Sequence, residues 1–284
     1  MPDPMEMTFG PEFCSVCGNP KISCVCGHGL VDDYTRVAEM KAKEKDIYSP
    51  SDENAPHGYI YGRRIIGRDT EINGGAYVAN GEAIVVDDEK YELTESCWTE
   101  IKAELDARIA RGLNHKDGIF RLVNDLVRKK MPYNLKAVEK IDDRITKKHS
   151  GWYKVSLDLF LDARAGVCRH QALLAGYLFE KMTKETYISP ENGRPIRYLR
   201  GKASVERNWS KKTGTGHAWT KYVAKSGDVV IVDPANNFIS TFDRLEEERL
   251  KRKNAGMMLW YYEGVSRDDP EEEIISGPIF PIPK

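Results

Sequence analysis

The order of the hydrophobic patterns along the chain restricts its fold more than any other feature. Apolar residues that recur every three to four positions predict amphipathic helices, and these lie over residues 96–113, 116–133 and 135–149. A further helix is predicted to begin near Cys168. After Met182 the pattern changes to short runs of β-branched and aromatic residues, which predict strands, within residues 194–206, 216–225 and 228–234. Helices followed by consecutive strands predict an α+β fold rather than alternating βαβ units.

Changes in composition divide the chain into five segments. A cysteine- and glycine-rich segment covers residues 1–30, and a charged linker with one exposed helix covers 31–57. Short β-branched runs separated by "NGG" and "NGE" predict a small antiparallel β-meander over 58–94, and its last run is "KYELT". The main domain is predicted over 95–265 and closes with a helix near "TFDRLEEERLKRKNAG". The acidic and then proline-rich tail, 266–284, is expected to be extended.

The charge balance gives no reason to expect two classes of partner. Lys and Arg number 43 against 44 Asp and Glu, so the formal net charge of the 284-residue chain is −1. This balance favours neither nucleic acid nor an anionic membrane as a partner. No apolar run approaches the roughly 20 residues that span a bilayer, and the first residues lack the pattern of a secretory signal. We therefore expect a cytoplasmic protein whose cysteines are reduced, metal-bound or catalytic.

A single cysteine stands at the start of the helix predicted in "ARAGVCRHQALLAGYLFEKM", residues 163–182. The thiolate is the reactive form of cysteine, and free cysteine has a pKa of about 8.5. The unpaired N–H groups and the dipole of a helix N-terminus lower that pKa. Cys168 therefore has the sequence context of a nucleophile.

A nucleophilic thiol needs a base, and His217 is the best candidate. His170 lies two residues after Cys168, and side chains two apart on a helix project about 200° from each other. His217 begins the strand "GHAWTKYV", and Asp233 ends the next strand, "VVIVDP". With a turn at 225–228 the two strands pair antiparallel and bring these side chains together. A thiol, an imidazole and an orienting carboxylate form the pattern of a nucleophilic enzyme.

These motifs together resemble the transglutaminase-like superfamily, which shares a papain-like cysteine-enzyme core. The resemblance rests on "GVCRHQALLAGYL", "IRYLRG", "GHAWTKYV" and "VVIVDP" in that order, and it covers roughly residues 118–240. It implies that Cys168 is the nucleophile, His217 the base and Asp233 its partner. The backbone N–H of Cys168 would contribute to an oxyanion hole, for which Trp152 and Tyr153 are candidate second donors.

The resemblance implies acyl transfer from an amide, peptide or isopeptide through a Cys168 thioester. We expect a protein or peptide substrate and water as the acceptor, because nothing in the sequence marks a site for an amine. Two alternatives stay open: transfer from protein glutamine to an amine, as in a transglutaminase, and a non-catalytic binding or scaffold module.

Other residues near these motifs have structural interpretations. Cys97, next to Trp98 on a predicted helix, is expected to be a core residue, and Trp219 is expected to belong to the core rather than to the reacting groups. Arg169 and His170 are expected to flank the site or to pair with the acidic regions around Asp162 and Glu180.

The N-terminal sequence "CSVCGNPKISCVCGHG" predicts a second site. Its C-x-x-C spacing, followed by glycine, is typical of a zinc knuckle, and a metal would explain how so short a segment folds. The predicted ligands of this structural zinc are Cys14, Cys17, Cys24 and Cys26. His28 is an alternative fourth ligand, and a redox dithiol or unliganded cysteines are the other interpretations.

Overall fold

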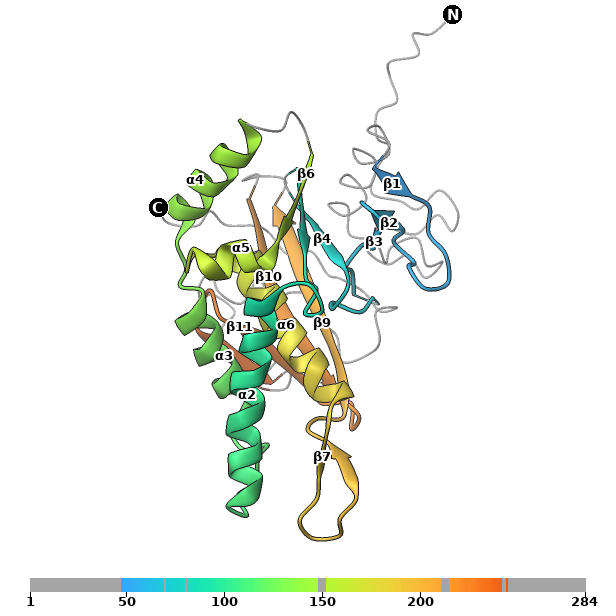
Figure 1. The fold of residues 1–284 in the computed structure, drawn as a ribbon, viewed down its shortest axis with the longest axis vertical. Helices are drawn as coiled ribbons and strands as arrows, with labels where there is room; N and C mark the ends of the chain where they lie inside the picture. Colours follow the sequence, from blue (N-terminus) through green and yellow to red (C-terminus); the bar gives the residue numbers. More distant parts are fainter. Residues whose placement is uncertain are drawn as a thin grey trace, which may run out of the picture.

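The computed structural model describes residues 47–68, 70–79, 81–147, 152–210, 215–241 and 244. These residues form helices and mainly antiparallel sheets, which confirms the predicted α+β class. The helix that begins at Cys168 packs on one face of the largest sheet, and other helices pack against that helix (Figure 1). Within the described part of the chain, no helix is long and apolar enough to cross a membrane. The segments predicted over 1–30 and 266–284 lie outside the described residues, as does nearly all of the helix predicted near the end of the main domain.

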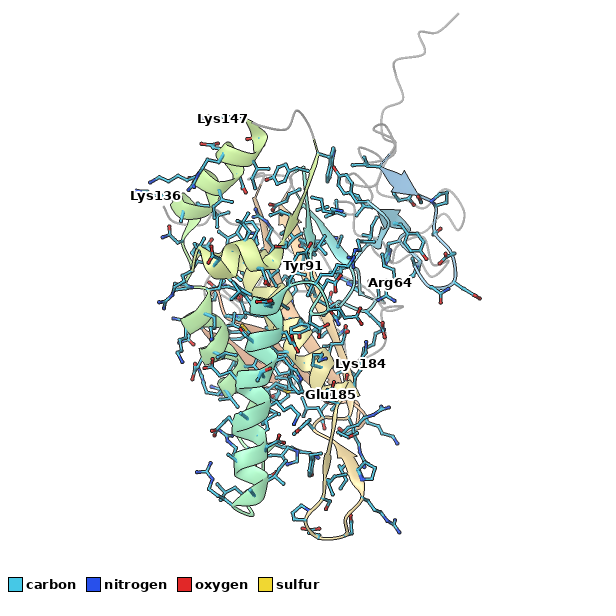
Figure 2. All side chains as sticks on the ribbon, in the orientation of Figure 1. Arg64, Tyr91, Lys136, Lys147, Lys184 and Glu185 are labelled. Atoms are coloured by element: carbon cyan, nitrogen blue, oxygen red, sulfur yellow. The ribbon has the colours of Figure 1, made fainter. Side chains whose placement is uncertain are left out.

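Five helices are described: α2 (Glu92–Ala110), α3 (Ile119–Lys130), α4 (Leu135–Thr146), α5 (Leu157–Asp162) and α6 (Cys168–Lys184). Four of them were predicted from periodicity, and α5 is a short addition between α4 and α6. Lys136 and Lys147 mark the two ends of α4, and Lys184 and Glu185 mark the C-terminal end of α6 (Figure 2). Most side chains of α6 are buried, so this helix forms the centre of the core.

The largest sheet has the order β12-β11-β10-β9 and is antiparallel throughout. Its strands are β9 (Gly201–Ser210), β10 (Thr215–Ala224), β11 (Val229–Asp233) and β12 (Phe238–Thr241). The predicted hairpin is confirmed, because Thr220 pairs with Val232 and Val223 with Val229 across the turn at 225–228. Strand β12 extends the sheet beyond the hairpin and was not predicted.

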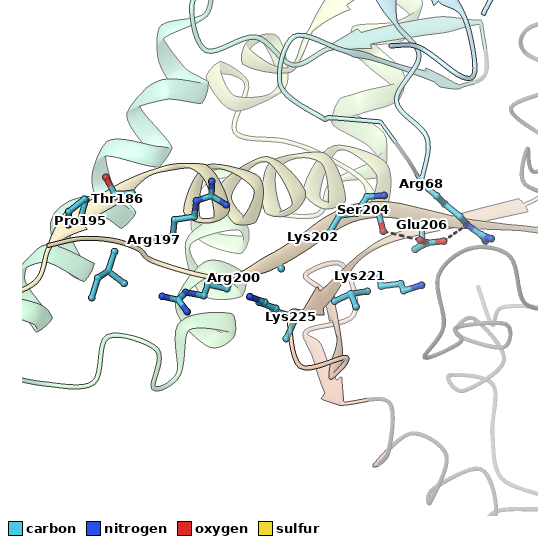
Figure 3. A pocket seen from close by; sticks show the side chains of 14 residues that line it. Arg68, Thr186, Pro195, Arg197, Arg200, Lys202, Ser204, Glu206, Lys221 and Lys225 are labelled. Carbon is cyan, nitrogen blue, oxygen red and sulfur yellow. Dashed lines mark hydrogen bonds and ion pairs between the residues drawn. The ribbon is translucent and has the colours of Figure 1, made fainter. Parts of the chain in front are cut away.

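The two faces of this sheet differ in chemistry. Strand β10 contacts α6 closely: the hydroxyl of Thr220 donates to the carbonyl oxygen of Ala172, at 2.9 Å. A Cβ on Gly176 of α6 would lie 3.1 Å from Val205 on β9, so this glycine permits the close approach. The opposite face carries polar side chains, among them Ser204 and Lys221 (Figure 3). The apolar core therefore lies on the helix side.

A second sheet is built from β4 (Ala76–Ala79), β5 (Glu82–Val85) and β6 (Tyr153–Ser156). Strands β4 and β5 form an antiparallel hairpin, and β6 pairs parallel with β5. Side chains alternate across it: Tyr77 and Ile84 join the main core, whereas Val78 and Val85 join a smaller apolar cluster with Ile60. The hairpin is thus buried on both faces and packs into the same core as the helices.

The single meander predicted over 58–94 is wrong in two respects. Strands β1 (Tyr48–Ser49), β2 (Tyr59–Ile60) and β3 (Arg63–Arg64) form a separate three-stranded sheet, and β1 belongs to the predicted linker. The run "KYELT" is not a strand but leads into α2. A residue far along the chain caps the start of α2: the N–H groups of Leu93 and Thr94 donate to the carboxylate of Asp158, at 2.7 and 2.8 Å.

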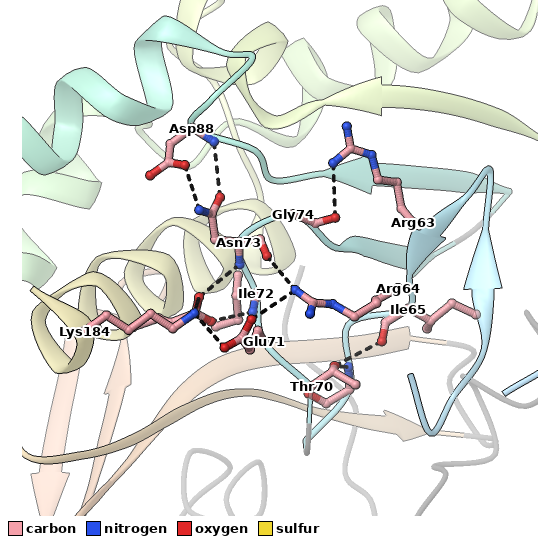
Figure 4. Close-up of polar contacts among 12 residues, drawn as sticks. Arg63, Arg64, Ile65, Thr70, Glu71, Ile72, Asn73, Gly74, Asp88 and Lys184 are labelled. Carbon is pink, nitrogen blue, oxygen red and sulfur yellow. Dashed lines mark hydrogen bonds and ion pairs between the residues drawn. The ribbon is translucent and has the colours of Figure 1, made fainter. Parts of the chain in front are cut away.

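The loop between β3 and β4 is anchored to the C-terminal half of α6 (Figure 4). The N–H of Ile72 donates to the buried carboxylate of Glu180, at 2.5 Å. Lys184 lies 2.9 Å from Glu180 and 2.8 Å from Glu71. Further along the chain, a short ribbon of β7 (Thr186–Ile188) and β8 (Pro195–Arg197) connects α6 to β9.

Candidate functional site

Cys168 is the first residue of α6, directly after a tightly packed loop. Gly166 donates to the carbonyl oxygen of Pro132 at 3.1 Å and accepts from the N–H of Asn134 at 2.9 Å. A Cβ on Gly166 would lie 2.6 Å from Cγ of Met131 and closer still to its sulfur, so only glycine fits without displacing Met131. The glycine in "AGVC" therefore fixes the chain entering α6 and, with it, the position of the thiol.

His217 and Asp233 meet as the hairpin predicts. Nε2 of His217 lies 2.5 Å from Oδ2 of Asp233, and both side chains are buried. Continuing the register of β10 and β11 by one pair beyond Thr220 and Val232 places Asp233 opposite Trp219, so His217 is its diagonal neighbour on the same face. The ring of Trp219 stacks on His217, with 6.0 Å between centroids. The carboxylate and the indole together fix the imidazole.

The same imidazole interacts with the sulfur of Cys168, because hydrogen bonding and charge couple the titration of the two groups. Cys168, His217 and Asp233, which come from a helix start and two strands, therefore form one hydrogen-bonded cluster. Cys168 is only partly buried, whereas Asp233 has no exposed surface. The cluster thus runs from a partly accessible thiol to a carboxylate inside the protein.

The electrostatics of the cluster favour a thiolate paired with an imidazolium. Burial alone raises the pKa of Cys168, but hydrogen bonding and the charge of His217, the Ala218 N–H and Arg169 outweigh it and hold this pKa below its ordinary value. Burial alone lowers the pKa of His217, but its hydrogen bonds to Asp233 and Cys168 raise it to about 10. Each group stabilises the charged form of the other.

The turn after Asp233 adds a residue that the sequence analysis missed. The Asn236 N–H donates to Oδ1 of Asp233 at 3.3 Å, and its side-chain amide donates to Oδ2 at 2.8 Å. The amide nitrogen also lies 3.2 Å from Nε2 of His217. An asparagine three residues after a strand-ending aspartate, in "DPAN", is a local signal for such a turn.

Helix α3 holds this turn from the other side. Arg128 donates to the carbonyl oxygen of Pro234 at 2.9 Å, and the amide of Asn124 donates to Oδ1 of Asn237 at the same distance. Asn237 adopts a left-handed conformation, with φ of 50°. Residues about 110 positions upstream therefore help to place Asp233.

Arg169 pairs with residues that the sequence did not indicate. Its Nε lies 2.5 Å from Oε1 of Glu82 on β5, and its Nη2 lies 3.8 Å from Asp142 on α4. Burial raises the pKa of Glu82 to about 7, against the opposing charge of Arg169. The predicted pairing with the regions of Glu180 and Asp162 is wrong, because Glu180 is bound to Ile72 and Lys184.

His170 has a structural position, as expected. It is fully buried, its ring packs against Phe160, and its Nδ1 accepts the N–H of Val167 at 3.1 Å. Burial, with the charge of Arg169, holds its pKa well below the ordinary value, so the ring is neutral. Cys97 is buried as predicted, and burial raises the pKa of its thiol to about 11. The pKa values of the two described thiols are therefore shifted in opposite directions.

Two aromatic residues considered as oxyanion donors are engaged elsewhere. The hydroxyl of Tyr153 lies 3.3 Å from Asp142 and 3.5 Å from Glu82, beside Arg169. Trp152 packs against the smaller apolar cluster, and its carbonyl oxygen accepts from Tyr61. Tyr133 is an aromatic residue near the thiol, because it bridges to Gly166; burial, with the charges of Cys168 and Asp233, raises its pKa.

Tyr133 was missed by the sequence analysis, although an aromatic residue after the helix-ending "MP" was a usable signal. Its side chain is 54% exposed, and the neighbouring Leu135 is 50% exposed. The segment that carries Tyr133 bridges directly to Gly166, two residues before the thiol. The rim of the cluster is therefore apolar on this side.

The predicted zinc ligands Cys14, Cys17, Cys24 and Cys26 lie outside the described residues, so the zinc site stays a prediction. Within the described ranges, no group of three or more His, Cys, Asp or Glu side chains is placed to hold a metal ion. Comparison with known proteins adds no relative: no protein family, curated protein or solved structure matches this chain.

Proposed function

We propose that this chain is a cysteine enzyme of the transglutaminase-like superfamily, with a papain-like core. It transfers acyl groups from amide, peptide or isopeptide bonds through a thioester on Cys168, and water is the preferred acceptor. The observation that carries the proposal is the hydrogen-bonded cluster of Cys168, His217 and Asp233, with the thiol at the open start of a buried helix.

The arrangement supplies each group that the reaction needs. The Cys168 thiolate attacks the carbonyl carbon of the substrate, and the carbonyl oxygen becomes an oxyanion near the first N–H groups of α6, which have no acceptor within the helix. His217 then gives its proton to the leaving amine as the C–N bond breaks, which leaves an acyl thioester. For hydrolysis, His217 accepts a proton from water, the hydroxide adds to the thioester, and the acid leaves as the thiolate returns.

Asp233 has an orienting role in this proposal. Because Nε2 of His217 faces the carboxylate, the other ring nitrogen, Nδ1, serves the sulfur. The buried carboxylate stabilises the imidazolium and holds the ring in place. Tyr133, which is exposed and bridges to Gly166 two residues before the thiol, would contact the substrate near the scissile bond.

A turnover assay tests the proposal. Wild-type protein and Cys168→Ala are incubated with a library of peptide anilides, with and without a primary amine such as putrescine, and products are identified by mass spectrometry. The proposal expects free acids that require Cys168. Amide products in the presence of the amine would favour a transglutaminase, and an unchanged library with intact, folded protein would favour a binding or scaffold module.

A further inference from the structure

A cavity lies on the polar face of the largest sheet, away from α6 (Figure 3). Its volume is about 770 Å³, and it is bounded by β8, β9, β10 and the loop that carries Arg68. None of its lining residues belongs to the cluster of Cys168, His217 and Asp233. Cavities of roughly 300–1,000 Å³ are the size that binds small molecules.

The charge of this cavity is strongly positive. Six cationic residues line it: Arg68, Arg197, Arg200, Lys202, Lys221 and Lys225. Glu206 is the one acidic residue in the lining, all of which lies in the described part of the chain. Its carboxylate is already engaged, because Nε of Arg68 lies 2.6 Å away and the hydroxyl of Ser204 donates to it at 2.9 Å. The protein as a whole has a net charge of −1, so this concentration is local.

Lys221 is the residue that most clearly suits the cavity to an anion. It sits in the middle of β10, opposite Ser204 of β9, and is only 8% exposed. Its ammonium makes no ion pair or hydrogen bond with any residue among those the structure describes. Its ammonium is not among the buried polar atoms that lack a partner, so it reaches accessible space, where an anion in the cavity would pair with it.

We propose that this cavity binds a small polyanion that carries two or more phosphate groups. Arginine guanidinium groups match phosphate oxygens in paired hydrogen bonds, and lysines add point charges. The exposed cations Arg197, Arg200 and Lys225 lie around the rim of the cavity, whereas Lys221 is less exposed and belongs to strand β10. This distribution suits a compact ligand whose charges are spread over several groups. A volume of about 770 Å³ matches a small ligand rather than a nucleic acid chain.

Isothermal titration of the full chain with inositol hexakisphosphate and with inorganic triphosphate tests the site. We expect saturable binding of one ligand per chain that weakens as salt rises. Lys221→Gln and Arg200→Gln should each weaken binding about tenfold, because each removes one charge-assisted contact. Lys140→Gln, an exposed lysine on α4, is the matched control and should leave affinity unchanged.

The arms of the experiment separate the alternatives. Equal weakening by Lys140→Gln would show nonspecific charge attraction and overturn the proposal, as would unchanged binding by the Lys221 and Arg200 variants. Tighter binding of a single-stranded oligonucleotide than of either phosphate ligand would overturn the small-ligand assignment. Tighter binding of citrate than of triphosphate would overturn the phosphate assignment and indicate a polycarboxylate ligand. If Lys221→Gln fails to fold, the exposed Arg200 variant alone decides.

Discussion

Replacing Asp233 with asparagine should move the pH dependence of Cys168 alkylation to higher pH. Asp233 is fully buried, and its Oδ2 lies 2.5 Å from Nε2 of His217. The pKa of His217 is raised to about 10, so the imidazolium is present below that pH and is lost above it. An amide in place of the carboxylate removes the negative charge that stabilises the imidazolium. The imidazolium in turn contributes most to lowering the pKa of Cys168, against burial and together with the Ala218 N–H and Arg169.

The size of the shift follows from the lost hydrogen bond. A hydrogen bond to a charged group contributes about 1.5–3 kcal/mol, and one pKa unit corresponds to about 1.4 kcal/mol. The pKa of His217 should therefore fall by about 1–2 units. Because Cys168 loses part of its cationic partner, its pKa should rise by a shift of similar order. The assay is the rate of iodoacetamide alkylation at Cys168 against pH, read by peptide mass spectrometry.

Two variants serve as controls for this measurement. Asp143→Asn makes the same chemical change at an exposed position on α4 and should leave the profile unchanged. Asn236→Ala removes one neutral donor at 2.8 Å from Asp233, so its shift should be less than about one unit. A folded Asp233→Asn protein whose profile superimposes on that of wild type would refute the reasoning, because the carboxylate would then not control the charge on His217.

Three further predictions concern other parts of the chain. Gly166→Ala should lower the free energy of unfolding by about 1–3 kcal/mol and slow Cys168 alkylation, because its Cβ meets Met131; adding Met131→Ala should restore the alkylation rate, and thermal melts with alkylation rates check both. Burial raises the pKa of Glu82 from 4.5 to about 7. Protonated Glu82 therefore stabilises the folded protein below pH 4.5, and this stabilisation is lost as the pH rises through 7. In urea titrations over that pH range, the free energy of unfolding of wild type should therefore fall by on the order of 3 kcal/mol relative to that of Glu82→Gln. Elemental analysis should find about one zinc per chain and none after serine replaces Cys14, Cys17, Cys24 and Cys26.

The parts of the fold that sequence predicted depend on local patterns. Helices α2, α3, α4 and α6 follow from apolar spacing, and the β10–β11 hairpin follows from two apolar runs around a short polar turn. The same hairpin was enough to bring His217 beside Asp233, because antiparallel register converts positions in sequence into neighbours in space. The core of the candidate site was therefore accessible from local reasoning.

The parts that sequence could not predict depend on distant partners. "KYELT" has strand-forming residues, yet Asp158 caps its backbone from 64 residues away and starts a helix there. Strand β6 is short, and its parallel partner β5 lies about 70 residues upstream. Arg169 has acidic neighbours in sequence but pairs with Glu82, 87 residues away. Tertiary contacts overrode local preference in each case.

Detection of an acyl adduct on Cys168 tests the central claim most directly. Wild-type protein is mixed with a peptide p-nitrophenyl ester, quenched in acid and analysed by intact mass and peptide mapping. The account predicts one acyl group per chain on Cys168, released by hydroxylamine and absent from Cys168→Ala, with Cys97 unmodified because burial raises the pKa of its thiol to about 11. An adduct that forms equally on Cys97, or acylation that persists unchanged in Cys168→Ala, would contradict it.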